Sequence, residues 1–359
     1  MNPSEEYVFP KRGFTSKNRS LLAAMTNKQS HEDGTLSDEE ITWLTRRAKD
    51  GFGIVTTAAS HVSELGKGWI GEMGVWSDNH IDGLTKLASS LKQNGSLNLV
   101  QIFHGGMKAP FEINNVIPVC PSKMMVEATG KLLARGLETE EIYQLIEDFS
   151  DAAKRCEDAG FDGVEIHGAH SYLISQFLGL KTNRRKDEFG GSLENRFRFL
   201  REIILSIRKK TSENFLVAVR ISPKIGTIGI SIEESLEVTE MLCEMDIDMF
   251  HLSCWDAFEE FEDGQNLTKL FKPLVPENIA YASTGAIWST ADANWLMDQG
   301  ADLVGVARVG IAHPNWAQGL VDSHYNPKRP PFTRDELAAA DLSPVFIDYM
   351  SMWKDFVKD

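Results

Sequence analysis

The chain has 359 residues, of which 42% are hydrophobic and 25% are charged, and its formal net charge at pH 7 is -15. This apolar content can fill a sizeable core, which excludes disordered and fibrous proteins. So acidic a chain repels a phosphate backbone, and its basic residues occur as scattered pairs and triplets, so nucleic acid is not an expected partner.

Eight short apolar segments spread along the chain are predicted to form β-strands. Most are β-branched or rich in leucine and do not alternate with polar residues, which is typical of parallel strands buried on both faces. In chain order they are Ser20–Ala24, Gly53–Ala58, Leu97–Phe103, Gly163–His167, Phe215–Ile221, Asp248–Ser253, Ile279–Ser283 and Asp302–Ala307.

The segments between these strands carry the spacing of amphipathic helices. Ser37 and Glu40 form the pattern of a capping box at the start of the first one. Gly160 lies where a later helix should end, as C-terminal glycine caps do. Apolar residues recur at helical spacing within residues 81–91, 142–156 and 197–207.

This alternation predicts a single α/β domain over residues 1–359, folded as a (β/α)8 TIM barrel. A Rossmann-type nucleotide domain is less well supported, because no Gly-x-Gly-x-x-Gly follows the first strand. Two segments exceed the minimal repeating unit. Residues 104–137 form a long excursion after the third strand, predicted to cap the active-site mouth, and residues 325–359 form a C-terminal tail.

Cysteine spacing and hydropathy indicate the cellular compartment in which we expect the protein. The four cysteines lie far apart and form no C-x-x-C pair, which argues against a zinc ribbon or an iron-sulfur cluster and favours a reducing environment. The first 14 residues are polar, and no segment approaches the roughly 20 apolar residues of a membrane span. We therefore expect a cytoplasmic protein with no membrane partner.

The end of the fourth predicted strand carries the strongest chemical signal. His167, His170 and Tyr172 place two imidazoles and a phenol within six positions, where barrel active sites are built. A lone histidine there would more often be structural, and a His pair three apart could share a metal, although no third ligand is evident. Two neutral imidazoles beside a phenol suit a carbonyl oxygen that gains charge while a proton is supplied nearby. That is the chemistry of reducing a conjugated carbonyl.

The ends of the last two strands indicate a phosphate site. Gly285 follows the seventh strand, and Ala307 and Arg308 close the eighth. Loops at these positions of a barrel commonly bind phosphate through backbone N–H groups, here with a guanidinium available. The signal is weak alone, because glycine after a strand is ordinary turn chemistry and Arg308 could pair with a carboxylate. A cofactor with an anionic tail is implied.

Further polar groups end the remaining strands. Met25 and Thr26 follow the first strand, Ala59 follows the second, and Gln101 and Arg220 lie within the third and fifth. Each could be ordinary barrel packing. Together, a hydroxyl, an amide and a guanidinium around one mouth could bond the pyrimidine edge of a flavin, with Arg220 stabilising charge near N1 and O2.

A long motif gives the chain a family resemblance. After His167, His170, Tyr172 and Leu173 come Gln176, Phe177, Leu178, Asn183, Arg185, Asp187, Phe189, Gly190, Gly191, Ser192, Glu194, Asn195, Arg196, Arg198 and Phe199. This run resembles the old yellow enzymes, which are FMN-containing ene-reductases and NAD(P)H-flavin oxidoreductases. Weaker matches, such as Asn18–Arg19 and Arg308 with Pro314, extend the resemblance over residues 7–325.

The resemblance implies a role for each candidate residue. Thr26 would contact the flavin near O4 and N5, beside the backbone of Ala59, while Gln101 and Arg220 would face its pyrimidine edge. Gly285, Ala307 and Arg308 would hold the FMN phosphate. His167 and His170 would bind the substrate carbonyl, and Tyr172 would donate the proton. Ser192 is a plausible helix N-cap.

Three positions depart from the family pattern. Ala24 occupies the position of the family's proline, Ala307 that of its glycine and Met107 that of its arginine. We expect altered cofactor geometry from the first two and altered substrate choice from the third.

The expected function is transfer of hydride from NADH or NADPH, by way of FMN, to an activated alkene such as an enone, or to a quinone-like acceptor. A protein that retains FMN for binding or sensing with little turnover is the alternative, and a metal-dependent hydrolase using His167 and His170 is a third reading. The sequence leaves the coenzyme preference open and is compatible with a homo-oligomer.

Overall fold

Strands that lack polar alternation must be covered on both faces, and the computed structural model, which describes residues 2–261 and 264–358, achieves this with a closed parallel barrel. The strands follow one another around it in the order β10-β11-β12-β13-β3-β4-β5-β9. Their bounds are β3 (Ser20–Leu22), β4 (Ile54–His61), β5 (Leu97–Phe103), β9 (Gly163–Gly168), β10 (Leu216–Ile221), β11 (Met249–Ser253), β12 (Ala280–Thr284) and β13 (Leu303–Val306). The predicted TIM barrel is confirmed.

One strand boundary differs from the prediction in a way that matters for the site. The second barrel strand, β4, continues to His61, so Ala59 lies inside it rather than after its end. Ala59 pairs with Gln101 of β5, just after an irregularity in the register that begins at Thr56. The bulge adds one residue to β4, a local feature that apolar periodicity does not reveal.

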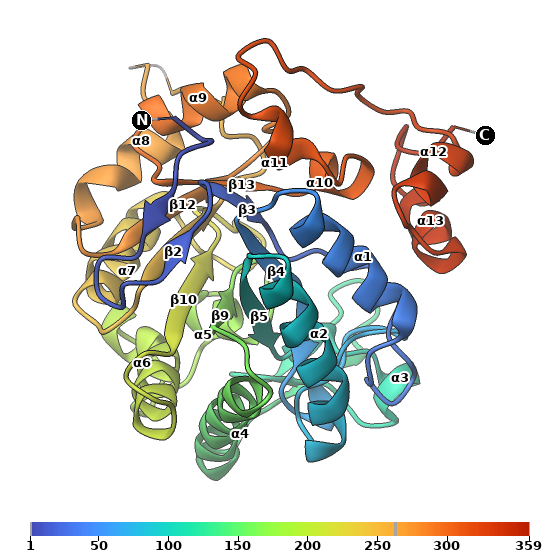
Figure 1. Ribbon diagram of the computed structural model, residues 1–359. Helices are drawn as coiled ribbons and strands as arrows, with labels where there is room; N and C mark the ends of the chain where they lie inside the picture. The colour runs from blue at the N-terminus through green and yellow to red at the C-terminus, as the bar shows by residue number, and fades with distance from the viewer. Residues whose placement is uncertain (1, 262–263, 359) are drawn as a thin grey trace.

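An outer layer of helices covers the barrel (Figure 1). The main helices that connect barrel strands are α1 (Asp38–Lys49), α2 (Ile81–Gln93), α4 (Thr139–Asp158), α6 (Leu193–Lys210), α7 (Ile232–Cys243), α8 (Leu267–Phe271) and α9 (Thr290–Asp298), and α10 (Arg308–Ala312) follows the last strand. Shorter pieces are α3 (Phe111–Asn114), α5 (Leu173–Leu178) and α11 (Trp316–Gly319), with 3-10 turns at Glu64–Gly66, Asp78–His80, Gly106–Lys108 and Lys272–Leu274.

The structure tests two predicted helix N-caps, Ser192 and Ser37. Ser192 accepts a hydrogen bond from the backbone of Asn195, as a helix N-cap should. Ser37 likewise caps α1 through the backbone N–H of Glu40, but the carboxyl group of Glu40 turns into the core and accepts from Asn27 at 2.8 Å. The predicted capping box at Ser37 is therefore half formed.

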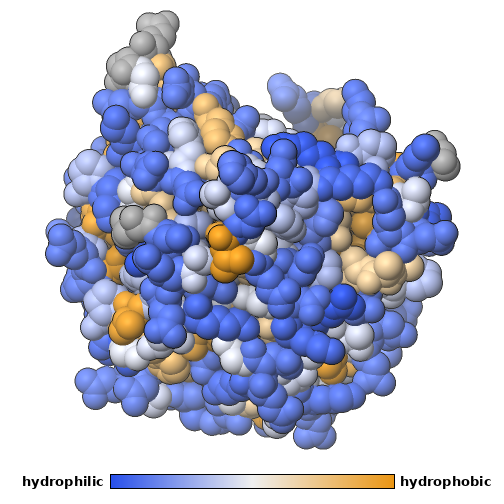
Figure 2. All heavy atoms as spheres, turned by 45° about the horizontal axis from the view of Figure 1, so that its top comes forward, coloured by the Kyte–Doolittle hydropathy of each residue, from blue (hydrophilic) through white to orange (hydrophobic). Residues whose placement is uncertain are grey.

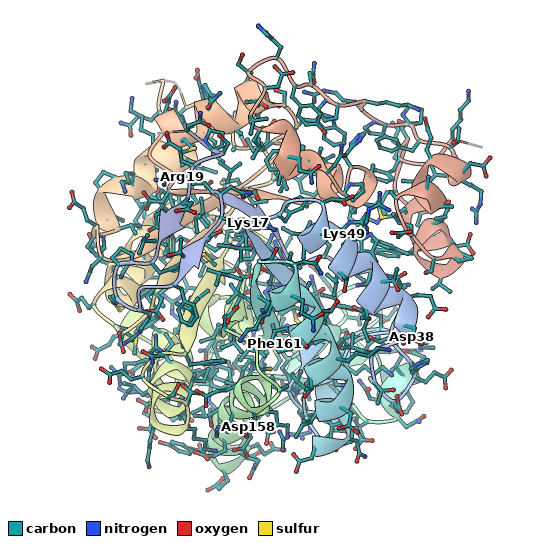
Figure 3. The ribbon with its side chains drawn as sticks, viewed as in Figure 1. Lys17, Arg19, Asp38, Lys49, Asp158 and Phe161 are labelled. Carbon is teal, nitrogen blue, oxygen red and sulfur yellow. The ribbon has the colours of Figure 1, made fainter. Side chains whose placement is uncertain are left out.

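The helix-to-strand turn after α4 follows the glycine pattern. Gly160 has a φ of +94°, which places it in the left-handed region and lets the chain turn from Asp158 inward to Phe161 (Figure 3).

At the same end of the barrel, Lys17 donates 2.9 Å hydrogen bonds to the carbonyl oxygens of Ala48 and Asn94, at the ends of α1 and α2.

The barrel interior is closed at its amino-terminal end by the start of the chain. Strands β1 (Tyr7–Val8) and β2 (Thr15–Ser16) form a hairpin that lies across this end (Figure 1). Tyr7 and Phe9 pack with one apolar layer of the barrel, which consists of Leu21, Ile54, Leu99, Leu216, Ala218, Met249, Ala280, Ala282 and Leu303. Chemistry is therefore confined to the opposite, carboxyl end of the strands.

The two segments beyond the minimal unit contain structure of their own. The excursion over 104–137 includes a three-stranded sheet of β6 (Val119–Cys120), β8 (Leu132–Gly136) and β7 (Met124–Met125). The C-terminal segment contains α12 (Arg334–Ala339) and α13 (Pro344–Ser351), which lie beside α1 and α10 (Figure 1). Trp43 of α1 packs against Phe346, with ring centroids 5.2 Å apart.

Exposed large hydrophobic side chains, such as Ile70, Leu205 and Val321, occur along the described chain. On the face shown in Figure 2, hydrophobic residues are scattered among hydrophilic ones. Across residues 2–261 and 264–358, no helix has the length and apolar character needed to span a bilayer.

Candidate active site

A tight turn after β9 brings the three predicted catalytic side chains together. His170 and Ser171 have φ angles of +59° and +64°, a conformation that L-residues rarely adopt. The turn folds Tyr172 back against His167, so that their ring centroids lie 5.0 Å apart. The His167 and His170 rings are also 5.0 Å apart. Sequence proximity and the left-handed turn together build this cluster.

The two imidazoles belong to one directed chain of hydrogen bonds. His167 Nδ1 accepts the backbone N–H of Ala169 at 3.2 Å, so its proton must sit on Nε2. That Nε2–H points to His170 Nδ1 at 3.2 Å, which leaves the His170 proton on Nε2, 2.9 Å from Ser253 Oγ. The imidazole N–H groups thus bond to one another and to Ser253, and an incoming oxygen must draw them away.

Both imidazoles are neutral at physiological pH. Burial holds the pKa of His167 and His170 well below the usual range, and the nearby positive charge of Arg220 acts in the same direction. Neutral imidazoles can donate hydrogen bonds to a carbonyl oxygen without adding a fixed charge to the site.

Tyr172 sits in an aromatic wall with a cation above it. Its ring is 4.9 Å from that of Phe103 and 6.5 Å from that of Trp69. Lys108 Nζ lies 5.1 Å from the centroid of the Tyr172 ring and donates a 2.8 Å hydrogen bond to the carbonyl of His170. Burial, aided by the carboxyl group of Glu72, raises the pKa of the Tyr172 phenol, which keeps it protonated.

Beneath this cluster, buried polar side chains cross the barrel interior. Glu165 accepts from Gln101 Nε2 at 2.7 Å and from His251 Nδ1 at 2.6 Å, and His251 Nε2 lies 2.6 Å from Thr284 Oγ1. Burial alone would raise the pKa of Glu165, but His251, Arg220 and Gln101 together lower it, so the carboxylate is ionised. The negative charge of Glu165 offsets the positive charge of the buried Arg220.

A second group of predicted residues lines a cavity of about 510 Å³, which we call the Arg308 cavity. Its walls include Arg220, Gly285, Ala307 and Arg308, together with His170, Ser253, Trp255, Trp288, Trp353 and Lys354. The last two come from the C-terminal segment. The cavity therefore joins the ends of several barrel strands with a part of the chain far away in sequence.

Two cationic side chains in the Arg308 cavity have unused hydrogen-bonding capacity. Arg220 donates to Ala24 O at 3.2 Å and to Ser253 Oγ at 3.0 Å, but its buried Nε has no hydrogen-bond partner. Arg308 is exposed and forms no ion pair with any described residue. In a chain of net charge -15, a free guanidinium at a cavity wall suits an anionic ligand.

Close packing explains the glycine at the predicted phosphate loop. A Cβ on Gly285 would lie 2.7 Å from the backbone nitrogen of Ala257, too close for any larger residue. Ala286, the next residue, has a φ of +57°. The loop after β12 thus packs tightly against the loop after β11, and its backbone forms part of the cavity wall.

The remaining predicted cofactor residues lie outside the lining of the Arg308 cavity. Met25 and Thr26 follow β3 and are half-buried, next to Ala24, whose carbonyl oxygen is bonded to Arg220. Ala59 and Gln101 are paired neighbours in β4 and β5. Arg220 contacts both groups of residues, because it lines the Arg308 cavity and donates a hydrogen bond to the carbonyl oxygen of Ala24, just after β3.

Three side chains that contact the predicted site residues were not among the sequence candidates. Ser253 ends the sixth barrel strand, a position that the strand-end rule could have singled out. Glu165 lies two residues before His167 on β9, so the two side chains share the inward face, and strand periodicity could have identified it. Lys108 follows Met107 in the excursion after β5. No sequence signal shows that Lys108 would reach Tyr172.

A metal site at the histidine pair lacks its remaining ligands. No group of three His, Cys, Asp or Glu side chains that could hold a metal occurs in the part of the chain that the structure describes. The four cysteines, Cys120, Cys156, Cys243 and Cys254, are free thiols.

Comparisons with known proteins agree with this architecture. The model of the NADH:flavin oxidoreductase / NADH oxidase family matches residues 11–326. The chain is 36% identical over 333 residues to a protein of Bacillus subtilis (strain 168) named a probable NADH-dependent flavin oxidoreductase, and the match covers 88% of each chain.

Comparison with solved structures also finds similar folds. The fold is similar to that of 2-naphthoyl-CoA reductase in complex with 2-naphthoyl-CoA, with a TM-score of 0.82 and 28% identity, over 89% of this chain and 52% of that one. It is also similar to the old yellow enzyme homologue from Zymomonas mobilis, with a TM-score of 0.81 and 25% identity, over 96% and 99% of the two chains.

Proposed function

Because the chain belongs to the NADH:flavin oxidoreductase / NADH oxidase family, we propose that it reduces an activated alkene, such as an enone, or a quinone-like acceptor. Members of this family use FMN with NADH or NADPH as electron donor, so the chain is an NAD(P)H-dependent flavin oxidoreductase.

The residues of the Arg308 cavity fit FMN. The unpaired Nε of buried Arg220 suits the electron-rich N1 and O2 edge of a flavin, and the ion-pair-free Arg308 suits its phosphate. Gly285 and Ala307 would complete the phosphate contacts through their backbone N–H groups. Met25 and Thr26, which follow β3, would contact the ring system together with Ala59 and Gln101, which lie within β4 and β5.

When bound, FMN would supply the chemistry of hydride transfer between the nicotinamide and the acceptor. His167 and His170 would orient the acceptor by donating N–H groups to its carbonyl oxygen, where negative charge develops. For this, the His170 N–H must turn from Ser253 and the His167 N–H from His170 Nδ1, since the two groups donate there in the structure.

Tyr172 would deliver a proton to the acceptor carbon next to the carbonyl. Its phenol stays protonated because its pKa is raised, and it lies within the same cluster as the two imidazoles. This juxtaposition of a protonated phenol with two neutral imidazoles is the observation that carries the proposal, because binding alone requires no proton donor.

The test is anaerobic addition of NADH or NADPH to the purified protein, followed by a panel of enones and quinones. We expect the flavin absorbance to bleach with the coenzyme and to return with an acceptor. A preparation without flavin absorbance would contradict the cofactor assignment. Bleaching without reoxidation by any acceptor would contradict the proposed reaction and favour a flavin-binding protein with little turnover.

A further inference from the structure

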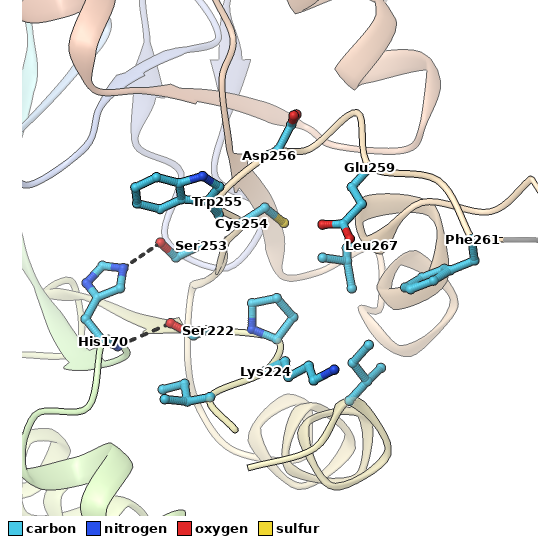
Figure 4. A pocket seen from close by; sticks show the side chains of 13 residues that line it. His170, Ser222, Lys224, Ser253, Cys254, Trp255, Asp256, Glu259, Phe261 and Leu267 are labelled. Carbon is cyan, nitrogen blue, oxygen red and sulfur yellow. Dashed lines mark hydrogen bonds between the residues drawn. The ribbon is translucent and has the colours of Figure 1, made fainter. Parts of the chain in front are cut away.

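A second pocket lies next to the Arg308 cavity, and the proposed reaction leaves it without a role. It has a volume of about 390 Å³, and we call it the Glu259 pocket (Figure 4). Its lining includes Lys224 and Ile225 after β10, and Trp255, Asp256, Glu259 and Phe261 after β11. It therefore opens at the carboxyl end of the barrel, beside the proposed site of chemistry.

The two spaces are adjoining parts of one mouth. His170, Ser253, Cys254 and Trp255 line both of them. A ligand whose reactive end lies at His170 can therefore extend its other end into the Glu259 pocket. The side chain of Trp255 is 84% exposed in the structure, which is unusual for so large an aromatic group and leaves its faces open to stacking.

The lining combines aromatic surface with charges of both signs. Trp255 and Phe261 offer flat apolar faces, while the side chains of Lys224 and Glu259 enter the pocket from opposite sides (Figure 4). Asp256 adds a second carboxylate. A ligand that matches this set has a planar ring, an anionic group for Lys224 and hydroxyl donors for the carboxylate.

We infer that the Glu259 pocket binds the adenosine diphosphate half of the coenzyme and makes NADH the preferred donor over NADPH. The adenine would stack on Trp255 or Phe261, the pyrophosphate would face Lys224, and the ribose hydroxyls would donate to Glu259. A carboxylate that accepts from the ribose 2′-hydroxyl repels the 2′-phosphate of NADPH. The inference deepens the proposed function by specifying its electron donor.

The experiment measures the dissociation constants of NADH, NADPH and reduced nicotinamide mononucleotide for the FMN holoenzyme by stopped-flow flavin reduction. The mononucleotide lacks the adenosine half and serves as an internal reference. Tetrahydro-NADH, which has no hydride to transfer, gives a binding readout without turnover through the flavin absorbance. The variants are Glu259→Gln and Lys224→Gln, with Glu237→Gln on the exposed side of α7 as a charge-matched control.

We expect the unaltered enzyme to bind NADH at least about 10-fold more tightly than NADPH, and Glu259→Gln to remove most of that difference. Lys224→Gln should weaken binding of NADH and tetrahydro-NADH by about 10-fold while leaving that of the mononucleotide unchanged. The Glu237→Gln control should match the unaltered enzyme throughout.

Equal affinity for NADH and NADPH, or a preference for NADPH, would overturn the inference. So would variants that change the mononucleotide and NADH constants alike, or that raise the KM of the acceptor instead, which would assign the pocket to the acceptor. These results are distinct from failure of the proposed function, in which the reduced flavin is not reoxidised by any enone or quinone.

Discussion

His170 and Arg220 donate to the same oxygen. His170 Nε2 lies 2.9 Å and Arg220 Nη2 lies 3.0 Å from Ser253 Oγ, so one hydroxyl couples the proposed carbonyl-binding histidines to the proposed flavin-binding arginine. A change at Ser253 should therefore disturb both the cofactor and the acceptor.

Replacing Ser253 with alanine tests this coupling. Ser253→Ala leaves Arg220, whose Nε already lacks a partner, with one further unpaired donor, and it frees His170 to change orientation. We expect the Kd for FMN and the KM for an enone each to rise by about 10-fold. Fluorescence titration with FMN and steady-state kinetics measure the two effects. Ser90→Ala, which removes a hydroxyl between α1 and α2, is the control. Unchanged values for both constants would show that the shared bond is incidental.

Replacing Tyr172 with phenylalanine tests the proposed proton donor. Tyr172→Phe should slow reoxidation of the reduced flavin by an enone by about 10²- to 10⁴-fold, the usual contribution of a general acid. Reduction of the flavin by NADH should change little, because that half of the cycle needs no such proton. Separate stopped-flow measurements of the two half-reactions distinguish these effects. Tyr143→Phe, an exposed tyrosine on α4, is the matched control.

The raised pKa of Tyr172 also fixes a pH dependence. The phenol of a proton donor is active when protonated, and its pKa lies above the ordinary value of 10.0. The rate of enone reduction should therefore not fall as the pH rises through the neutral and mildly alkaline range. A decline in the reoxidation rate with a midpoint near pH 8 would argue against Tyr172 as the donor.

Arg308 can be tested without turnover. Arg308→Gln should weaken FMN binding by about 10- to 100-fold, since a hydrogen bond to a charged group contributes about 1.5–3 kcal/mol. Riboflavin, which lacks the phosphate, should bind the variant and the unaltered protein equally. Flavin fluorescence titrations of the apoprotein measure both constants. Arg334→Gln, on α12 and paired with Asp348, is the control. Equal weakening of FMN and riboflavin would place the effect of Arg308 away from the phosphate.

Buried His104 should make the protein less stable in acid. Burial lowers its pKa from 6.5 to about 4, so the unfolded chain takes up the proton first as the pH falls. The stability that neutral His104 contributes is complete above pH 6.5 and is lost progressively as the pH falls to about 4. The loss approaches about 3 kcal/mol at the low end of this window.

Urea unfolding over this pH range compares the unaltered protein with His104→Gln. The variant should lose less free energy of unfolding between pH 6.5 and 4, whatever its stability at neutral pH. His324→Gln replaces an exposed histidine and should keep the full pH dependence. Parallel curves for the unaltered protein and His104→Gln would show that His104 does not titrate as its burial requires.

The sequence by itself determined the barrel and the chemical types of its site. Apolar runs without alternation define strands buried on both faces, and all eight predicted strands are present in the closed barrel. His167, His170 and Tyr172 meet because they are neighbours in the chain around one turn. Gly285 and Arg308 line one cavity because parallel strands bring their carboxyl ends to the same rim.

Only the tertiary structure decided which of these groups touch. Ser253 joins His170 and Arg220 across 83 and 33 positions of the chain, and Lys108 reaches the Tyr172 ring from the excursion after β5. Strand periodicity tells which face a side chain occupies, but contacts across the mouth depend on barrel closure, on bulges such as the one in β4, and on loop paths. The neutral histidines and the protonated phenol follow from burial in that closed fold.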